Sequence, residues 1–80
     1  MTREEVLNNL KNIVEEVLDL EDLQLEESTT AADVEDWDSI MHVEIIVAVE
    51  EHFNVKFSTM EIEGFQNVGN ITDGIIKKLS

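Results

Sequence analysis

Residues 36–53 have the sequence DWDSIMHVEIIVAVEEHF, and this stretch decides the fold. It contains a cluster of β-branched residues around Ile45, which taken alone would suit a strand. The segment continues without a glycine or proline for far longer than a typical strand of about 5 to 6 residues, so its length favours a helix. Asp38 is a good N-cap because its carboxylate suits the positive end of a helix. We therefore predict a helix from Asp38 to Asn54.

The apolar residues of this helix predict which side faces the core. We expect the inner face to be formed by Ile40, Val43, Val47 and Phe53, widened by Ile46 and Val49. Glu44, Glu50 and Glu51 fall largely opposite, so we expect them on the outer face.

A first helix is predicted from Thr2 to Asp19. Thr2 and Glu5 have the spacing of a capping box, in which each side chain satisfies a free backbone amide at the helix start. One apolar stripe follows at three- and four-residue spacing, formed by Val6, Leu10, Ile13, Val14, Val17 and Leu18.

The segment from Leu20 to Trp37 has no single period and is expected to be a long connection. A connection of this length is uncommon in a compact domain, and spanning the length of a small helical bundle would explain it. Its isolated apolar residues would then pin it to the core: Leu20, Leu23, Leu25 and Val34.

The C-terminal part predicts two further helices. Ser58 and Glu61 have capping-box spacing and begin a helix of about two turns. The stretch from Phe65 to Asn70, bracketed by Gly64 and Gly69, is expected to be flexible. The last helix should begin near Asn70 or Thr72 and point four residues inward: Ile71, Ile75, Ile76 and Leu79. The fold class is thus all-α, with four helices, a long loop after the first and a short third helix.

Composition limits the classes of function. Eighty residues make one domain at most, which we place at residues 1–80. The chain has no cysteine, the first residues lack the apolar core of a signal peptide, and no apolar run approaches the roughly 20 residues that span a bilayer. We expect a cytoplasmic monomer. The net charge of −14 argues against nucleic acid or an anionic membrane as a partner and favours partners with basic surfaces.

Ser39 is the candidate functional residue. A catalytic serine needs a base, an orienting acid and an oxyanion hole. His42 lies three residues on, but Asp38 is better placed to cap the helix, and only the helix start could stabilise an oxyanion. We therefore expect no enzymatic activity. His42 and His52 are expected to face solvent, and they predict no metal site.

Asp38-Ser39-Ile40 is similar to the phosphopantetheine attachment motif of the acyl carrier protein family, and residues 36–53 resemble that family's second helix. The resemblance implies a four-helix bundle of the acyl carrier type. It also implies that Ser39 accepts phosphopantetheine from coenzyme A, with Asp38 and Ile40 completing the motif. Such a protein carries acyl intermediates as thioesters in fatty-acid, polyketide or related biosynthesis.

The resemblance also implies roles for residues around the helix. Partner docking is expected from Glu44, Glu50, Glu51, Val43 and Val47. A pocket that shelters the acyl chain is expected from Val43, Ile46, Val47, Ile62, Phe65 and Ile75. The implied partners are a phosphopantetheinyl transferase and acyl-loading, acyl-transfer or condensing enzymes with basic docking surfaces.

Some positions depart from the family pattern and leave alternatives open. Asp36 stands where the family often has glycine, Trp37 where a small residue is common, and Met41 where an acid is common. Trp37 either packs against the loop or first helix, or contacts a partner or the arm. The alternative functions are an aminoacyl or peptidyl carrier and an acidic protein-interaction module with Ser39 as a mere cap. Only a carrier requires Ser39 to be modified.

Overall fold

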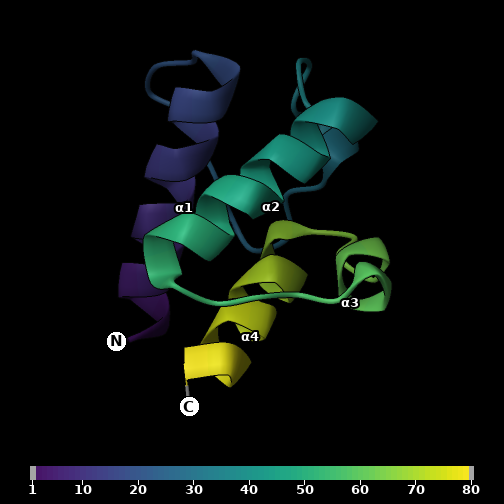
Figure 1. The fold of residues 1–80 in the computed structure, drawn as a ribbon. Coiled ribbons are helices and arrows are strands. Elements are labelled where there is room, and N and C mark those ends of the chain that lie inside the picture. The colour runs from purple at the N-terminus through teal and green to yellow at the C-terminus, as the bar shows by residue number, and fades with distance from the viewer. Residues whose placement is uncertain (1, 80) are drawn as a thin grey trace.

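The structure, a computed structural model, describes residues 2–79 and contains four α-helices (Figure 1). They are α1 (Arg3–Leu18), α2 (Ser39–Phe53), α3 (Thr59–Glu63) and α4 (Val68–Leu79), with a short 3-10 helix, η1 (Ala31–Asp33), in the long loop. The predicted all-α class, the long loop and the short third helix are confirmed. None of the helices within residues 2–79 is long and apolar enough to cross a membrane.

The starts of α1 and α2 are set by side-chain caps that the sequence predicts. The Thr2 hydroxyl accepts a hydrogen bond from the Glu5 amide at 3.2 Å, and the Glu5 carboxylate accepts one from the Thr2 amide at 2.9 Å. The Asp38 carboxylate accepts from the Met41 amide at 2.9 Å. Both helices end at a residue in the left-handed conformation, Asp19 and Asn54, with φ of 56° and 57°. Asparagine and aspartate tolerate this conformation better than most side chains.

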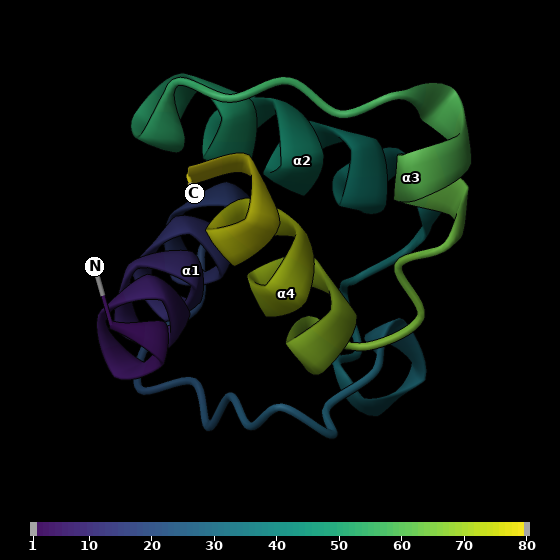
Figure 2. The same cartoon turned by 90° about the horizontal axis from the view of Figure 1, so that it is seen from below.

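The core lies between α1, α2 and α4. In Figure 2, α4 lies beside α1, and α2 runs across both, while α3 stands apart at one side. The buried core residues on the three long helices are Val6, Leu10, Ile13, Val14, Leu18, Ile45, Ile46, Val49, Phe53, Val68, Ile71 and Ile75. The predicted inward positions Ile71 and Ile75 are thus confirmed, whereas Leu79 is 43% exposed.

The predicted inner face of α2 is only partly confirmed. Ile46, Val49 and Phe53 are buried as predicted. Ile40, Val43 and Val47 were also predicted to face inward, but they are 70%, 54% and 46% exposed, and the helix buries Ile45 instead. The helix is apolar around most of its circumference, so the pattern fits two different faces equally well. Packing against α1 and α4 together selects the face that carries Ile45 and Val49, and the other apolar stripe remains at the surface.

The loop between α1 and α2 is fastened to the core along its length. Leu20, Leu23 and Leu25 are half-buried against the core, and Val34 is buried, as predicted. The backbone adds further anchors, because the Val68 amide donates to the Thr29 carbonyl and the Gly69 amide to the Glu27 carbonyl, both at 2.8 Å.

These backbone contacts explain why α4 begins earlier than predicted. The first amides of a helix lack partners inside it and normally need a cap. Here carbonyl groups of the loop accept hydrogen bonds from the amides of Val68 and Gly69. The Asn67 side chain accepts one from the Asn70 amide at 2.8 Å. A Cβ on Gly69 would lie 3.0 Å from the Glu27 carbonyl oxygen, so the close approach favours glycine. The glycine that suggested a flexible stretch instead lets the loop dock.

Arg3 joins the start of α1 to the loop and to α4. Its guanidinium pairs with the Glu27 carboxylate and donates to Asp73 at 2.6 Å. The hydrogen bond from Arg3 holds the pKa of Glu27 below its ordinary value of 4.5. A carboxylate with a lowered pKa in the folded state stabilises the fold above its unfolded pKa, and this contribution is lost as pH falls through the folded value.

We therefore expect Arg3→Gln to destabilise the protein more at pH 7 than at pH 3. Urea melts at both pH values measure the difference in the free energy of unfolding between the wild type and the variant. Titration of the other acids affects both proteins alike and cancels in this difference. Lys56→Gln is the control, because it removes one exposed positive charge that has no ion pair within the described residues. A difference in stability that is the same at both pH values would contradict this role of Glu27.

Candidate functional site

Ser39 is the first residue of α2, and its side chain is exposed. Asp38 before it uses its carboxylate to cap the helix, as predicted. Within the described residues the Ser39 hydroxyl makes no hydrogen bond, so it is not the cap. Ile40 after it is 70% exposed. The Asp-Ser-Ile motif therefore places an exposed hydroxyl, without a hydrogen bond in the described residues, at the N-terminus of a helix of 15 residues. This end of the helix carries the positive end of the dipole.

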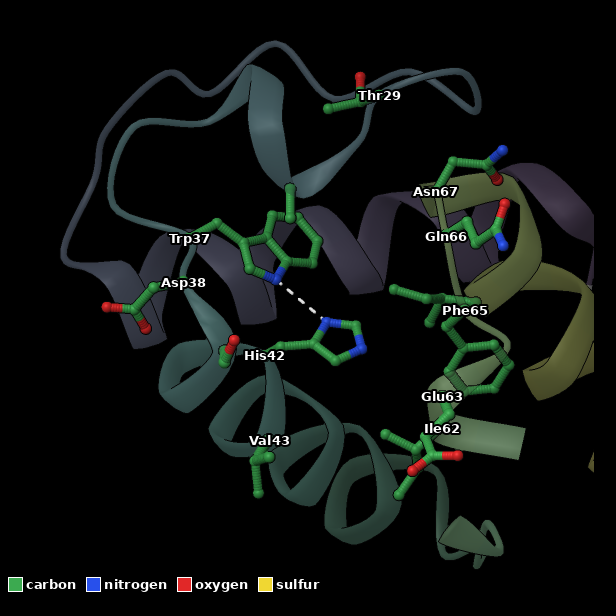
Figure 3. A pocket seen from close by; sticks show the side chains of 13 residues that line it. Thr29, Trp37, Asp38, His42, Val43, Ile62, Glu63, Phe65, Gln66 and Asn67 are labelled. Carbon is green, nitrogen blue, oxygen red and sulfur yellow. Dashed lines mark hydrogen bonds between the residues drawn. The ribbon is translucent and has the colours of Figure 1, made fainter. Parts of the chain in front are cut away.

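A cavity of about 700 Å³ opens beside Ser39 (Figure 3). The start of α2, the loop before it, α3 and the segment leading into α4 form its walls. Its apolar lining consists of Ala31, Trp37, Val43, Ile62, Phe65 and Ile71. Its polar lining consists of Thr29, Asp38, Ser39, His42, Glu63, Gln66 and Asn67. A space of this size falls in the range of small-molecule sites, which is about 300–1,000 Å³.

The residues predicted for the acyl pocket separate into three groups. Val43, Ile62 and Phe65 line the cavity. Ile46 and Ile75 are 1% and 0% exposed and belong to the closed core instead. Val47 is 46% exposed on the outside of α2, so its prediction as a pocket residue is wrong. The cause is that α2 buries a partly different face from the predicted one, so Val47 lies on the outside of the helix and Val43 lies at the rim of the cavity.

Phe65 and α3 form the wall opposite α2. The Phe65 ring meets the Phe57 ring edge-on, with 5.2 Å between centroids. A Cβ on Gly74 would lie 2.8 Å from Phe65 Cζ, so the absence of a side chain there makes room for the ring. Lys78 at the end of α4 holds α3 through an ion pair with Glu61 at 3.2 Å. The pKa of Glu61 is lowered mainly by the hydrogen bond it accepts from the Ser58 amide and, to a smaller extent, by the one it accepts from Lys78.

Trp37 and His42 meet at the side of the cavity near Ser39. Trp37 is 5% exposed and belongs to the hydrophobic core, which favours the alternative in which it packs inside the protein. Its Nε1–H donates to His42 Nδ1 at 3.1 Å. His42 is therefore half-buried and bonded, and the prediction that it faces solvent is wrong, whereas His52 is exposed. The sequence gives no sign of the pair, because Trp37 is in the irregular loop.

The predicted docking residues do not all lie free on the surface. Glu44 and Glu51 are exposed on α2, on the same side as Ile40, Val43 and Val47. We call these five residues the outer face of α2. Glu50 is half-buried, and its carboxylate accepts a hydrogen bond from the Phe57 amide at 2.8 Å. Glu50 thus holds the segment between α2 and α3.

No metal centre is indicated by the part of the chain that the structure describes. In residues 2–79, no group of three or more histidine, aspartate or glutamate side chains is arranged to hold an ion. The chemistry available at the site is that of one free hydroxyl, a nearby imidazole and a partly apolar cavity.

Comparisons with known proteins agree with this geometry. The family model described as a phosphopantetheine attachment site matches residues 8–75. The acyl carrier protein of Acidothermus cellulolyticus is 38% identical over 77 residues, covering 94% of this chain and 89% of the relative. The meromycolate extension acyl carrier protein of Mycolicibacterium smegmatis is 33% identical over 76 residues, covering 95% of this chain and 77% of the relative.

A solved structure supports the same assignment. The solution structure of the holo acyl carrier protein from Geobacter metallireducens superposes with a TM-score of 0.87. It is 36% identical, and the match covers 92% of this chain and 85% of that one. The predicted fold of the acyl carrier type is thereby confirmed. The chain belongs to the acyl carrier protein family, and it carries acyl groups on a covalently attached phosphopantetheine.

Proposed function

We propose that Ser39 is the residue to which phosphopantetheine is attached. The observation that carries the proposal is the exposed, unbonded Ser39 hydroxyl at the start of α2, beside the cavity. Ser58 also lies at a helix start, but its hydroxyl accepts a hydrogen bond from the Glu61 amide at 3.1 Å. Ser28 lies in the loop, outside any helix. Among the serines of residues 2–79, Ser39 is thus the one whose surroundings favour modification.

The residues around Ser39 fit a phosphodiester. The first amides of α2 and the helix dipole favour a negative group at this position. The Ile40 side chain leaves the hydroxyl open, because it points into solvent. When bound, the arm supplies a thiol that holds the acyl group as a thioester. The protein contributes the attachment point, the cavity and the docking surface, and it acts as a carrier and not as a catalyst.

The cavity is proposed to shelter the acyl group close to the protein. Val43, Ile62 and Phe65 provide apolar contacts on facing walls, one from α2 and two from the α3 side. Ile71 also lines the cavity, although the sequence did not predict it as part of the pocket. Burial of apolar cargo here would be favourable by about 25 cal/mol per Å² removed from water.

The outer face of α2 is proposed to dock the phosphopantetheinyl transferase and the enzymes that load, transfer or condense acyl groups. Three apolar residues, Ile40, Val43 and Val47, lie beside two exposed carboxylates, Glu44 and Glu51. A partner with a basic rim and an apolar centre would complement this surface. Exposed charges mainly raise the rate of encounter, which suits a carrier that must also leave each enzyme.

The pathway is proposed to be fatty-acid or related biosynthesis. The relatives include one named for meromycolate extension beside others named only as acyl carrier proteins. Cytoplasmic location, a monomeric state and a single domain over residues 1–80 remain predictions from the sequence.

Mapping of the modified residue tests the proposed attachment. The purified protein is incubated with coenzyme A and a transferase of broad specificity, digested, and analysed by tandem mass spectrometry. We expect the added phosphopantetheine on the peptide that contains Ser39 and on that residue. Modification at Ser28 or Ser58 in place of Ser39 would overturn the assignment.

Charge reversal on the outer face of α2 tests docking. Glu44→Lys combined with Glu51→Lys should slow transferase loading about tenfold at low salt, since opposite charges steer association. The rate of the wild type should itself fall as salt is added, because salt screens exposed charges.

Glu4→Lys with Glu21→Lys is the matched control for docking. It makes the same change in net charge at exposed positions on α1 and the loop. We expect both double variants to keep the fold by circular dichroism and only the α2 variant to load slowly. Equal loading rates for the two double variants would show that the glutamates of α2 contribute only to the net negative charge of the protein and not to a docking surface.

A further inference from the structure

The Trp37–His42 pair sets the direction of a hydrogen bond inside the cavity. The two ring centroids are 6.1 Å apart with the planes at 29°, and Trp37 Nε1–H donates to His42 Nδ1 at 3.1 Å. An indole N–H can only donate, so Nδ1 of His42 must be the acceptor. A neutral His42 then carries its proton on Nε2, because the bond at one ring nitrogen decides the tautomer.

The free end of His42 faces the cavity. Figure 3 shows the imidazole pointing from α2 into the space between Trp37 and the wall formed by Ile62 and Phe65. Within residues 2–79, His42 Nε2 has no hydrogen-bond partner. A role in packing alone explains why Trp37 needs an acceptor, but it leaves this donor facing an open space without a partner.

Ser39 places a ligand within reach of that donor. Residues three apart on a helix are neighbours, with Cβ atoms about 5–6 Å apart, so His42 lies one turn along from Ser39. Both residues line the same cavity. A group attached to the Ser39 hydroxyl therefore passes the imidazole before it reaches the apolar part of the cavity.

We propose that Trp37 and His42 form a seat for the part of the phosphopantetheine arm nearest to Ser39, in which His42 Nε2–H donates to an arm oxygen. This proposal rests on the attachment at Ser39 proposed above. The phosphate, the hydroxyl and the first carbonyl of the arm are the acceptors closest to the attachment point. The seat turns the arm toward the cavity rather than into solvent.

The negative charges around the cavity disfavour the phosphate of the arm, and a hydrogen-bond donor on the cavity wall would offset this effect. Asp38 and Glu63 line the same space, and the chain has a net charge of −14, so a phosphodiester there is repelled by its surroundings. His42 supplies a donor on the cavity wall that accommodates the arm's acceptor oxygens. The bonds from Trp37 to His42 and from His42 to the arm run in one direction, so each polarises the next. His42 is a positioning residue in this arrangement.

Nuclear magnetic resonance of the loaded wild type tests the seat directly. The arm is introduced from isotope-labelled coenzyme A, and loading is first verified by intact mass. We expect nuclear Overhauser contacts between arm protons and the rings of Trp37 and His42. The chain has one tryptophan, so its indole N–H signal is unambiguous and should shift between the unloaded and loaded forms.

Two substitutions at His42 separate positioning from packing. Gln can accept from Trp37 and still donate to the arm, so His42→Gln should keep the contacts. His42→Phe keeps a ring but neither bond, and the docked fraction of the arm should fall about fivefold, the factor for one net hydrogen bond. His52→Phe is the matched control, because His52 is exposed on the same helix outside the cavity.

Loaded wild-type protein without arm contacts to either ring, and with an unchanged indole signal, would overturn the seat. Equal arm contacts in His42→Phe and wild type would overturn it as well. Should His42→Phe fail to fold, the wild-type contacts and the Gln variant still decide. A protein that gains no mass, or gains it at another serine, refutes the attachment at Ser39 and is thus a distinct failure.

Discussion

Phe53→Ala should destabilise the protein by about 3–5 kcal/mol, the range for removing a buried aromatic side chain. Phe53, the last residue of α2, is 8% exposed and belongs to the hydrophobic core. Its ring meets the His52 ring edge-on, with 4.8 Å between the centroids. A domain of 80 residues has a total stability of about 4–12 kcal/mol. The variant is therefore expected to be partly unfolded without denaturant.

Urea denaturation followed by circular dichroism measures this loss. Ile40→Ala is the control, because it truncates an apolar side chain on the same helix that is 70% exposed, and it should change stability by about 0.5 kcal/mol or less. Should Phe53→Ala not fold, Phe53→Leu gives a smaller measurable loss. A loss at Phe53 below about 1 kcal/mol, or equal to that at Ile40, would show that α2 buries a different face.

The starts of α1, α2 and α3 were predictable because short polar motifs decide them locally. Thr2 with Glu5 and Ser58 with Glu61 form the capping boxes that their spacing predicts, and Asp38 caps α2. Each motif acts within four residues, so no knowledge of tertiary contacts is needed. The exception is α4, whose first amides are satisfied by the distant loop at Glu27 and Thr29.

The buried face of α2 was only partly predictable from periodicity. A helix with one apolar stripe has one choice of inner face, but α2 has a second stripe at Ile40, Val43 and Val47. Local pattern cannot rank two apolar stripes, because the choice depends on which one meets α1 and α4. The surplus stripe is the one proposed for docking, so the failure of the pattern coincides with a proposed functional surface.

The cavity was only partly predictable for a related reason. Ile62 and Phe65 were assigned to the pocket by the family resemblance, and both line the cavity. Trp37, Thr29 and Ala31 come from a loop without periodicity, and nothing local says which way they point. Glu50 was assigned to docking by the family resemblance, whereas its hydrogen bond from the Phe57 amide depends on how the segment after α2 turns.

Ser39→Ala should abolish the addition of phosphopantetheine altogether, because the alanine methyl group carries no oxygen to attack coenzyme A. The substitution removes no hydrogen bond within the described residues, and Ser39 is exposed. Its cost to stability should therefore be about 0.5 kcal/mol or less. Circular dichroism of the variant should match that of the wild type, so loss of loading would be chemical and not the result of unfolding.

The intact mass of three proteins after incubation with coenzyme A and a transferase tests the central claim most directly. These are the wild type, Ser39→Ala and Ser58→Ala, the last removing a serine that caps the start of α3. The account predicts that the wild type and Ser58→Ala each gain the mass of one phosphopantetheinyl group while Ser39→Ala gains none. A Ser39→Ala protein that still gains this mass, or a wild type that never does, would contradict it.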